Sequence, residues 1–169
     1  MDHESLAEQI EDFRLPRYNE IPDVGLYLDQ TAKYIMQYLN MLEDITITNS
    51  MISNYVKKNL VPSPVKKQYT REHIAILIFI AIAKSVISLD NISRLMAFQK
   101  SCYDTRIAYN YFCDEFEQAV RIVFGIKGDL PEISENNKEE KMLLRNLVVT
   151  AANEVYLAKY FASIPENMP

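Results

Sequence analysis

Residues 47–96 read ITNSMISNYVKKNLVPSPVKKQYTREHIAILIFIAIAKSVISLDNISRLM, and this segment decides the fold. Apolar side chains at helical spacing predict a helix over residues 49–58, with Thr48 or Asn49 as its N-cap. Asn59 follows, and asparagine tolerates the left-handed conformation that ends many helices. We therefore expect a short helix with one polar face. Its buried face consists of Met51, Ile52, Tyr55 and Val56.

The rest of this segment is expected to be one extended loop and two further helices. Residues 60–69 contain two prolines two positions apart, which hold the chain extended. Thr70 caps a helix over residues 71–87 that is apolar on almost every side, as is typical of the buried centre of a domain. Ser88 caps a fourth helix. The inward-facing residues of that helix are Leu89, Ile92, Leu95 and Met96.

On the N-terminal side, residues 1–19 are expected to form an extension with at most one loose helix, because Pro16 and Pro22 interrupt the chain. Asp23 is a suitable N-cap for a helix that reaches about Asn40. Its apolar residues follow the i, i+3, i+4, i+7 spacing of an amphipathic helix. They are Val24, Tyr27, Leu28, Thr31, Tyr34, Ile35, Tyr38, Leu39 and Leu42.

On the C-terminal side, the pattern predicts a helix over residues 103–124 that ends at Gly125, a polar connector over 127–137 and a last helix over 138–161. The fold class is therefore all-α. We expect three parts, which are an extension over 1–19, a helical domain over 20–98 and, after a boundary near 98–102, a C-terminal helical hairpin over 101–163 for dimerisation or sensing.

The composition excludes several classes of protein. Three glycines are too few for a Gly-rich phosphate loop, and they disfavour a β-rich fold. The most apolar run, residues 74–83, is shorter than the ~20 residues that cross a bilayer. The N-terminus lacks the basic start of a signal peptide. We expect a cytoplasmic protein that is not bound to a membrane.

The charge is unevenly distributed along the chain. The net charge is −5, yet residues 45–71 contain no Asp or Glu. This acid-free part holds five cations, so the remaining residues together carry −10. A local basic strip on an acidic protein is typical of a surface that meets an anionic partner. The five cations are Lys57, Lys58, Lys66, Lys67 and Arg71.

The same segment resembles the DNA-binding domain of the MerR family. That family has a helix ending in Tyr-x-x-x-Gly-Leu, a basic wing with proline, a tyrosine and two further helices. Ser53-Asn54 stands where the family usually has Arg-Tyr or Arg-Phe, and the wing lacks the usual Gly-Tyr-Arg. The resemblance implies a winged helix-turn-helix over residues 20–98. The matching residues are Tyr55, Asn59, Leu60, Pro62, Pro64, Lys66, Lys67, Tyr69, Ser88, Leu89, Ile92 and Leu95.

A second resemblance covers more of the chain. The stretches LPRY, IPDVGLYLDQ and ITNSMISNYVKKNLVPSPVKKQY are similar to a bacterial domain-of-unknown-function family, number eighteen thirty-six, from Gram-positive bacteria. The similarity extends over about residues 13–125. It implies a fold and a cytoplasmic location but no particular activity.

These observations predict a transcriptional regulator that binds double-stranded DNA, most simply as a homodimer on paired half-sites. The second helix of a helix-turn-helix lies in the major groove, where Asn54 could pair with adenine. The basic wing would hold phosphates without reading sequence. A small-molecule effector is possible. The predicted DNA-binding residues are Asn49, Ser50, Ser53, Asn54, Lys57, Lys58, Lys66, Lys67, Tyr69 and Arg71.

Other functions stay open as alternatives. The chief one is a helical protein–protein interaction module that has kept the fold and lost DNA binding, which the acidic balance favours. No catalytic motif is present, so we expect no enzyme, no cofactor and no metal site. Cys102 and Cys113 could share a helix face as a sensor, or be plain buried thiols. His73 is expected to cap or pack. The carboxylates expected to be solvated are Glu115, Glu117, Glu139 and Glu140.

Overall fold

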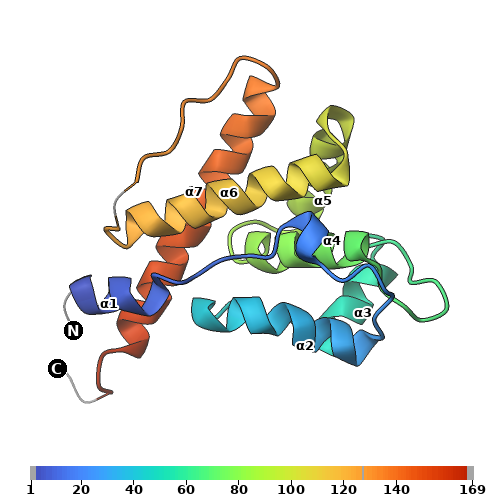
Figure 1. The fold of residues 1–169 in the computed structure, drawn as a ribbon, viewed down its shortest axis with the longest axis horizontal. Helices are drawn as coiled ribbons and strands as arrows, with labels where there is room; N and C mark the ends of the chain where they lie inside the picture. The colour runs from blue at the N-terminus through green and yellow to red at the C-terminus, as the bar shows by residue number, and fades with distance from the viewer. Residues whose placement is uncertain (1–2, 127, 167–169) are drawn as a thin grey trace.

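The structure is a computed structural model that describes residues 3–126 and 128–166. Residues 1–2 of the expected extension and residue 127 of the expected connector lie outside the described residues. The described chain is helical and contains no β-strand, only two isolated bridges, which confirms the all-α prediction (Figure 1). Its elements are α1 (His3–Ile10), η1 (Tyr18–Glu20), α2 (Leu28–Leu39), η2 (Asn40–Leu42), α3 (Asn49–Lys57), α4 (Arg71–Ala83), α5 (Leu89–Cys102), α6 (Thr105–Val123) and α7 (Lys138–Ala162).

The caps of the central helices form as predicted. The Met51 amide donates to the Thr48 hydroxyl at 3.2 Å at the start of α3, and the Asn91 amide donates to Ser88 at 3.2 Å at the start of α5. Asn59 follows α3 in the left-handed conformation, with φ 58°. Helix α4 ends at Ala83 rather than at 87, because the amides of Ser85 and Val86 bond to carbonyls three residues back and tighten the chain into turns.

Helix α2 begins at Leu28, so the prediction that Asp23 caps it is wrong. The reason is a tertiary contact that no local pattern reveals. Leu26 is held extended by Tyr69, since each amide donates to the other's carbonyl, at 2.9 and 2.7 Å. Val24 therefore lies outside the helix, and 69% of its surface is exposed.

Gly25 permits this pairing. A Cβ atom at position 25 would lie 2.6 Å from the Oε1 atom and 2.7 Å from the Cβ atom of Gln68. Carbon atoms do not approach so closely, so any larger residue would force the two segments apart. The glycine thus allows the segment before α2 to lie against the residue that precedes Tyr69.

The core is continuous across the boundary expected near residues 98–102. Helix α4 is buried on nearly all sides, and it packs against α6 and α7 as well as α2. Phe79 of α4 meets Phe112 of α6 edge-on, with ring centroids 5.0 Å apart. All the buried apolar residues described belong to one cluster. The segments 20–98 and 101–163 therefore form one packed unit.

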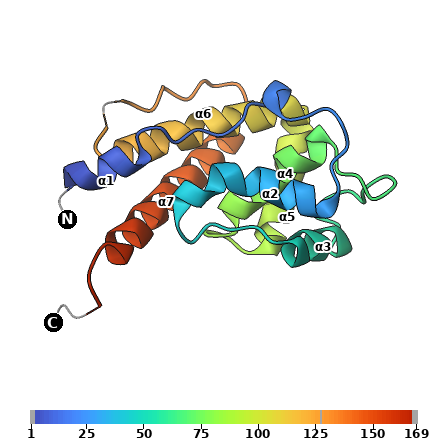
Figure 2. The ribbon, with the colours of Figure 1, turned by 60° about the horizontal axis from the view of Figure 1, so that its bottom comes forward.

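The N-terminal extension is packed rather than loose. Figure 2 shows that α1 and the segment after it run alongside α6. Arg17 forms an ion pair with Glu117, whose Oε1 atom also accepts from the Leu15 amide at 2.8 Å. The Tyr109 hydroxyl donates to the Pro16 carbonyl at 2.7 Å. The extension thus stabilises α6. Its fully buried apolar residues are Leu6, Ile10 and Leu15.

The expected C-terminal pair of helices is present as α6 and α7. These two helices make the largest helix–helix contact among the described residues, and they cross in Figures 1 and 2 instead of lying side by side. Their alanines, Ala119 on α6 and Ala151 and Ala152 on α7, are buried, which allows close approach. The arrangement is therefore a crossed pair rather than an antiparallel hairpin.

The prediction of solvated carboxylates is wrong at three of the four positions. Glu115 is 2% exposed and receives two hydrogen bonds from Arg145, at 2.7 and 3.0 Å. Glu117 is held by the N-terminal extension. Glu140 is 1% exposed, and its Oε2 atom has no hydrogen-bond partner among the described residues. Only Glu139 is exposed as expected.

Replacing Glu140 with Gln is expected to stabilise the protein at neutral pH by about 1 kcal/mol, because it removes a buried charge that forms no ion pair among the described residues and whose Oε2 atom has no hydrogen-bond partner there. Burial raises the pKa of Glu140 above its usual 4.5, so the folded state binds this proton more readily than the unfolded chain. The carboxyl therefore favours folding most below pH 4.5, and that contribution is lost as the pH rises through the raised pKa. Urea unfolding at several pH values measures the difference.

The exposed neighbour provides the control, since Glu139→Gln should leave the free energy of unfolding unchanged within about 0.5 kcal/mol. A Glu140→Gln variant that is less stable than the parent at pH 7 would contradict this assignment.

Candidate nucleic-acid interface

Helix α3 presents the polar face that the sequence predicts. Ile52 and Tyr55 are buried against the rest of the protein. The opposite face is open to solvent along the whole helix and through Lys58, its C-cap residue. The exposed residues are Asn49, Ser50, Ser53, Asn54, Lys57 and Lys58.

The wing, residues 60–69, ends in a tight turn with two lysines at its tip. The Val65 amide donates to the Gln68 carbonyl at 3.2 Å, and the Gln68 amide donates to the Val65 carbonyl at 2.9 Å. Lys66 and Lys67 lie between these bonds with φ 52° and 62°. Two successive left-handed residues are the mark of a type I′ turn, which usually contains Asn-Gly. The lysines are therefore held in a strained conformation at the most exposed point of the wing.

The base of the wing is anchored by residues that the sequence had suggested for DNA binding. Tyr69 is 5% exposed, and its ring lies 5.6 Å from that of His73. The Arg71 guanidinium donates to the Ile21 carbonyl at 2.8 Å and lies over the Tyr18 ring. In this structure both Tyr69 and Arg71 therefore support the wing from behind.

His73 performs the capping role expected of it. Its Nδ1 atom accepts from the Thr70 amide at 3.0 Å, and its Nε2 atom lies 3.4 Å from the Ser63 carbonyl oxygen. The ring thus joins the start of α4 to the first part of the wing. Because the imidazole is buried and bonded on both sides, it has no free nitrogen for catalysis or for a metal.

Four lysines of the candidate surface lack acidic partners. Among the described residues, no carboxylate lies within 4.0 Å of Lys57, Lys58, Lys66 or Lys67, although eight ion pairs form elsewhere. Asp29 of α2 interacts with Asn49 at the start of α3. A hydrogen bond from Lys33, with a smaller contribution from Asn49, lowers the pKa of that carboxyl. The four lysines form no ion pair with an acidic residue of the described chain.

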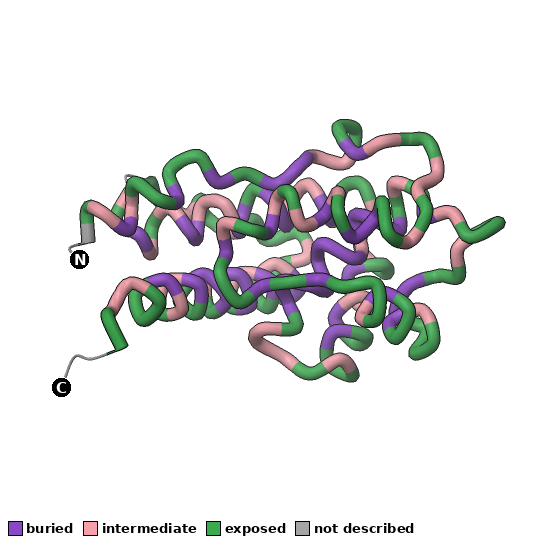
Figure 3. The backbone as a smooth tube through the Cα atoms, turned by 90° about the horizontal axis from the view of Figure 1, so that it is seen from below, coloured by how far each residue is buried: buried purple, intermediate pink, exposed green. Residues whose placement is uncertain are grey.

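Helix α3 and the wing occupy the same end of the molecule. In Figures 1 and 2 both lie at the right, and the two chain ends approach the left. The wing tip projects from the body as an exposed loop in Figure 3. Neither α6 nor α7 covers the outward face of α3, since all its polar residues are exposed. The polar face of α3 and the wing tip are therefore both open to solvent at this end of the molecule.

The connection between α2 and α3 is longer than the one that joins the two helices of a helix-turn-helix. Residues 40–48 join α2 to α3 through the η2 turn and an extended stretch, whereas the usual connection has about three or four residues. Ile45 and Ile47 are buried, so the longer connection packs onto the core. Helices α2 and α3 still contact each other.

The cysteines do not form the shared face that their spacing allowed. Cys102 ends α5, whereas Cys113 lies on α6, where burial raises its pKa to about 12. A thiol with so high a pKa is unreactive. Among the described residues, no group of three or more His, Cys, Asp or Glu side chains could hold a metal ion.

A cavity lies behind the wing, and sequence reasoning did not predict it. It measures about 330 Å³ and is bounded by residues 59–63 and by α4, α5 and the start of α6. No local motif marks it, because its walls come from segments as far apart in the sequence as Asn59 and Phe112. Only the packing of the wing base against three helices brings them together.

Fold and surface together define an all-α protein with a basic helix and wing displayed at one end. The family model described as "Domain of unknown function (DUF1836)" matches residues 16–112, more than half of the chain, so the chain belongs to that family. The matched region includes α2 to α5, the wing and the first part of α6. No curated protein and no solved structure matches this chain.

Replacing Lys66-Lys67 with Asn-Gly is expected to raise the free energy of unfolding by about 1 kcal/mol, because Asn and Gly fit the left-handed turn that lysine strains. The same change removes both charges from the wing tip, so it should weaken the binding of a polyanion. Thermal unfolding and duplex binding of the same variant check the two effects. An unchanged or lower stability would contradict the strained-turn assignment.

Proposed function

We propose that this chain is a DNA-binding transcriptional regulator of MerR-like type. Helix α3 would enter the major groove, and the wing would contact the phosphates beside it. The observation that carries the proposal is the set of four exposed lysines without acidic partners, on a protein whose net charge is −5. Unpaired cations repel one another, and a phosphate backbone would relieve that repulsion.

The geometry of α3 supports a role in base recognition. Ser50, Ser53 and Asn54 lie on its open face, and Lys57 continues that face by one turn. Short polar side chains let a helix approach base edges closely, and an asparagine can pair with adenine in a bidentate manner. The lysines at the end of α3 and on the wing would then fix the register.

The MerR-like part of the proposal rests on the order of the elements. A helix with an exposed polar face is followed by a proline-containing wing with a basic tip, and then by a tyrosine that closes the wing at its base. The longer connection between α2 and α3 changes the angle available to the recognition helix, so the docking would differ in detail from that family.

A second candidate function is a protein–protein interaction module. Three apolar side chains near the wing, Val24, Tyr27 and Val65, are more than half exposed. An apolar rim beside unpaired lysines suits an acidic protein partner as well as a nucleic acid. The two candidates differ in their ligand, since only the first requires a duplex.

The proposed regulator would act as a homodimer in the cytoplasm. Exposed apolar residues on α7, Leu157 and Phe161, lie one helical turn apart and offer a contact for a second copy. Among the described helices, none has the length and apolar character needed to cross a membrane. We expect sedimentation to show a dimer for the parent protein and a monomer for the Leu157→Glu variant.

The test of the proposed function is a selection of bound fragments from sheared genomic DNA, followed by gel shift of the recovered duplexes. The regulator proposal predicts a common sequence among them and a shifted complex with the parent protein. An Asn54→Ala variant should lose that preference while still retarding duplexes at low salt. Failure to retard any duplex at low salt would favour the interaction module.

A further inference from the structure

We propose that the cavity behind the wing binds a small apolar monoanion, such as an aromatic carboxylate. The cavity measures about 330 Å³, which falls at the lower end of the range for small-molecule sites. The cavity is open to solvent on one side, where its lining residues Ser63, Ser93 and Ala97 are exposed, so a small molecule can enter it from outside.

The apolar walls indicate that the main part of the ligand is apolar. Ile76 and Phe79 of α4, Met96 of α5 and Phe112 of α6 line the space. Phe79 and Phe112 are almost fully buried and pack edge-on against each other, so they form a rigid apolar inner wall against which an aromatic group could pack. Methionine adapts to irregular shapes, so Met96 suits a wall that contacts different ligands.

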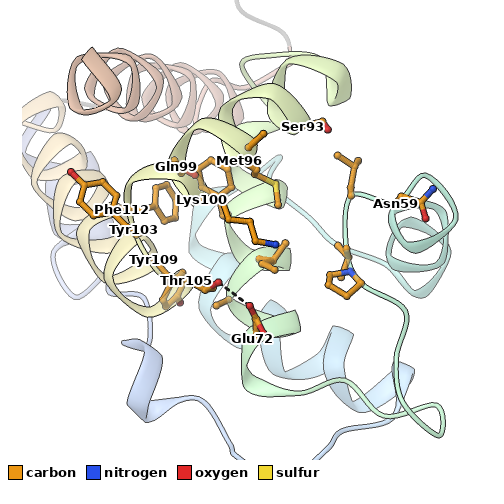
Figure 4. Close-up of a pocket in the computed structure, with 18 of the residues that line it drawn as sticks. Asn59, Glu72, Ser93, Met96, Gln99, Lys100, Tyr103, Thr105, Tyr109 and Phe112 are labelled. Atoms are coloured by element: carbon orange, nitrogen blue, oxygen red, sulfur yellow. Dashed lines mark hydrogen bonds between the residues drawn. The ribbon is translucent and has the colours of Figure 1, made fainter. Parts of the chain in front are cut away.

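The charged residues at the cavity indicate which charge the ligand carries. Lys100 of α5 and Glu72 of α4 are the charged residues of the lining. Glu72 already accepts a hydrogen bond from the Thr105 hydroxyl at 2.9 Å and sits in the first turn of α4, where the helix dipole favours a carboxylate. Lys100 has no ion-pair partner within the described parts of the chain, and Figure 4 shows its nitrogen among the lining side chains. A carboxylate placed beside Lys100 would give this cation a partner, whereas Glu72 is already engaged by Thr105.

Occupation of this cavity would also affect the wing. Residues 59–63 form one wall, and the wing tip with Lys66 and Lys67 follows directly. His73 ties the same segment to α4 through the Ser63 carbonyl. A ligand that packs against Val61 and Pro62 would therefore fix the wing relative to α4, and this regulatory consequence rests on the proposed DNA binding.

The experiment uses 2-naphthoate as the probe, with uncharged 2-naphthylmethanol and cationic 2-naphthylmethylammonium as matched compounds. Calorimetry and methyl NMR of the full chain follow binding. We expect one saturable site for 2-naphthoate, a shift of the Met96 methyl signal and an unchanged signal for Met142, which lies on α7 outside the cavity. Lack of saturation, or equal shifts at both methionines, would overturn the proposed site.

Two variants test the walls and the charge. Lys100→Gln should weaken the binding of 2-naphthoate about fivefold, since one partly exposed ion pair contributes about 1 kcal/mol. The affinity for 2-naphthylmethanol should not change. Ala97 is an exposed residue of the lining, and Ala97→Trp places a bulky side chain there. This variant should bind both compounds at least tenfold more weakly. Tighter binding of the ammonium compound than of the carboxylate would assign the charge to Glu72 and overturn the monoanion proposal.

The experiments can disprove the ligand site and the proposed DNA binding independently of each other. If 2-naphthoate binds as described but no duplex binds, the cavity proposal stands and DNA binding is wrong. If a duplex binds and 2-naphthoate does not, the cavity proposal is wrong. If both bind, saturating 2-naphthoate should change the duplex affinity at least twofold, and the Ala97→Trp variant should abolish this effect.

Discussion

The Arg145→Met variant is expected to lose about 3–5 kcal/mol of unfolding free energy, because it leaves the Glu115 carboxylate buried without its partner. Arg145 donates two hydrogen bonds to this carboxylate across the α6–α7 crossing, and Glu115 is 2% exposed. The carboxylate that remains is only 2% exposed, so water would solvate its charge poorly. Urea unfolding followed by circular dichroism measures the loss.

The double variant Glu115→Leu with Arg145→Met separates charge from packing. It removes both members of the pair and keeps apolar volume at the crossing, so its stability should return to within about 1 kcal/mol of the parent. Lys138→Met provides the surface control, because its ion pair with Glu135 is exposed and contributes little. A double variant as unstable as the single one would show that the pair acts through shape alone.

The Lys66→Ala, Lys67→Ala variant is expected to bind duplex DNA about thirtyfold more weakly, on the basis of about 1 kcal/mol for each lost phosphate contact. The loss should be the same for every duplex sequence, because the wing holds phosphates and does not read bases. Fluorescence anisotropy with several unrelated duplexes measures it.

A variant of equal charge on another surface provides the control for this prediction. Lys138→Ala with Lys141→Ala removes the same two charges from the first turn of α7, away from α3 and the wing. If this variant weakens binding as much as the wing variant does, the effect reflects net charge, and the wing has no special role.

Much of the fold could be predicted from residues 47–96, because local signals there agree with one another. Thr48, Asn59 and Ser88 occupy helix ends that their side chains favour, and the prolines exclude a helix from the wing. The apolar character of α4 on all sides predicted its central place. Each of these signals acts within a few residues, so one sequence suffices to read it.

Tertiary contacts explain where the prediction was wrong. Leu26 pairs with Tyr69, which delays the start of α2. Glu115 looks like any surface carboxylate until α7 brings Arg145 to it. The extension over residues 1–19 is polar enough to suggest a loose segment, yet Glu117 on α6 holds it. Such partners lie far away in sequence, and a single chain offers no pattern that joins them.

The residues of the candidate surface also fall into two groups, those that local sequence signals place correctly and those whose position depends on tertiary contacts. Eight of the ten predicted DNA-binding residues are exposed, as a polar helix face and a loop tip should be. Tyr69 and Arg71 follow the wing closely in sequence and share its polar or basic character, yet their side chains turn inward to support it. The cavity behind the wing depends wholly on packing.

The most direct test of the account is the salt dependence of duplex binding by the unmodified protein. If the four unpaired lysines hold phosphates, the logarithm of the binding constant should fall against the logarithm of salt concentration with a slope of about −3 to −4 for each protomer. A slope near zero, or no binding at low salt, would contradict the claim that α3 and the wing form a nucleic-acid surface.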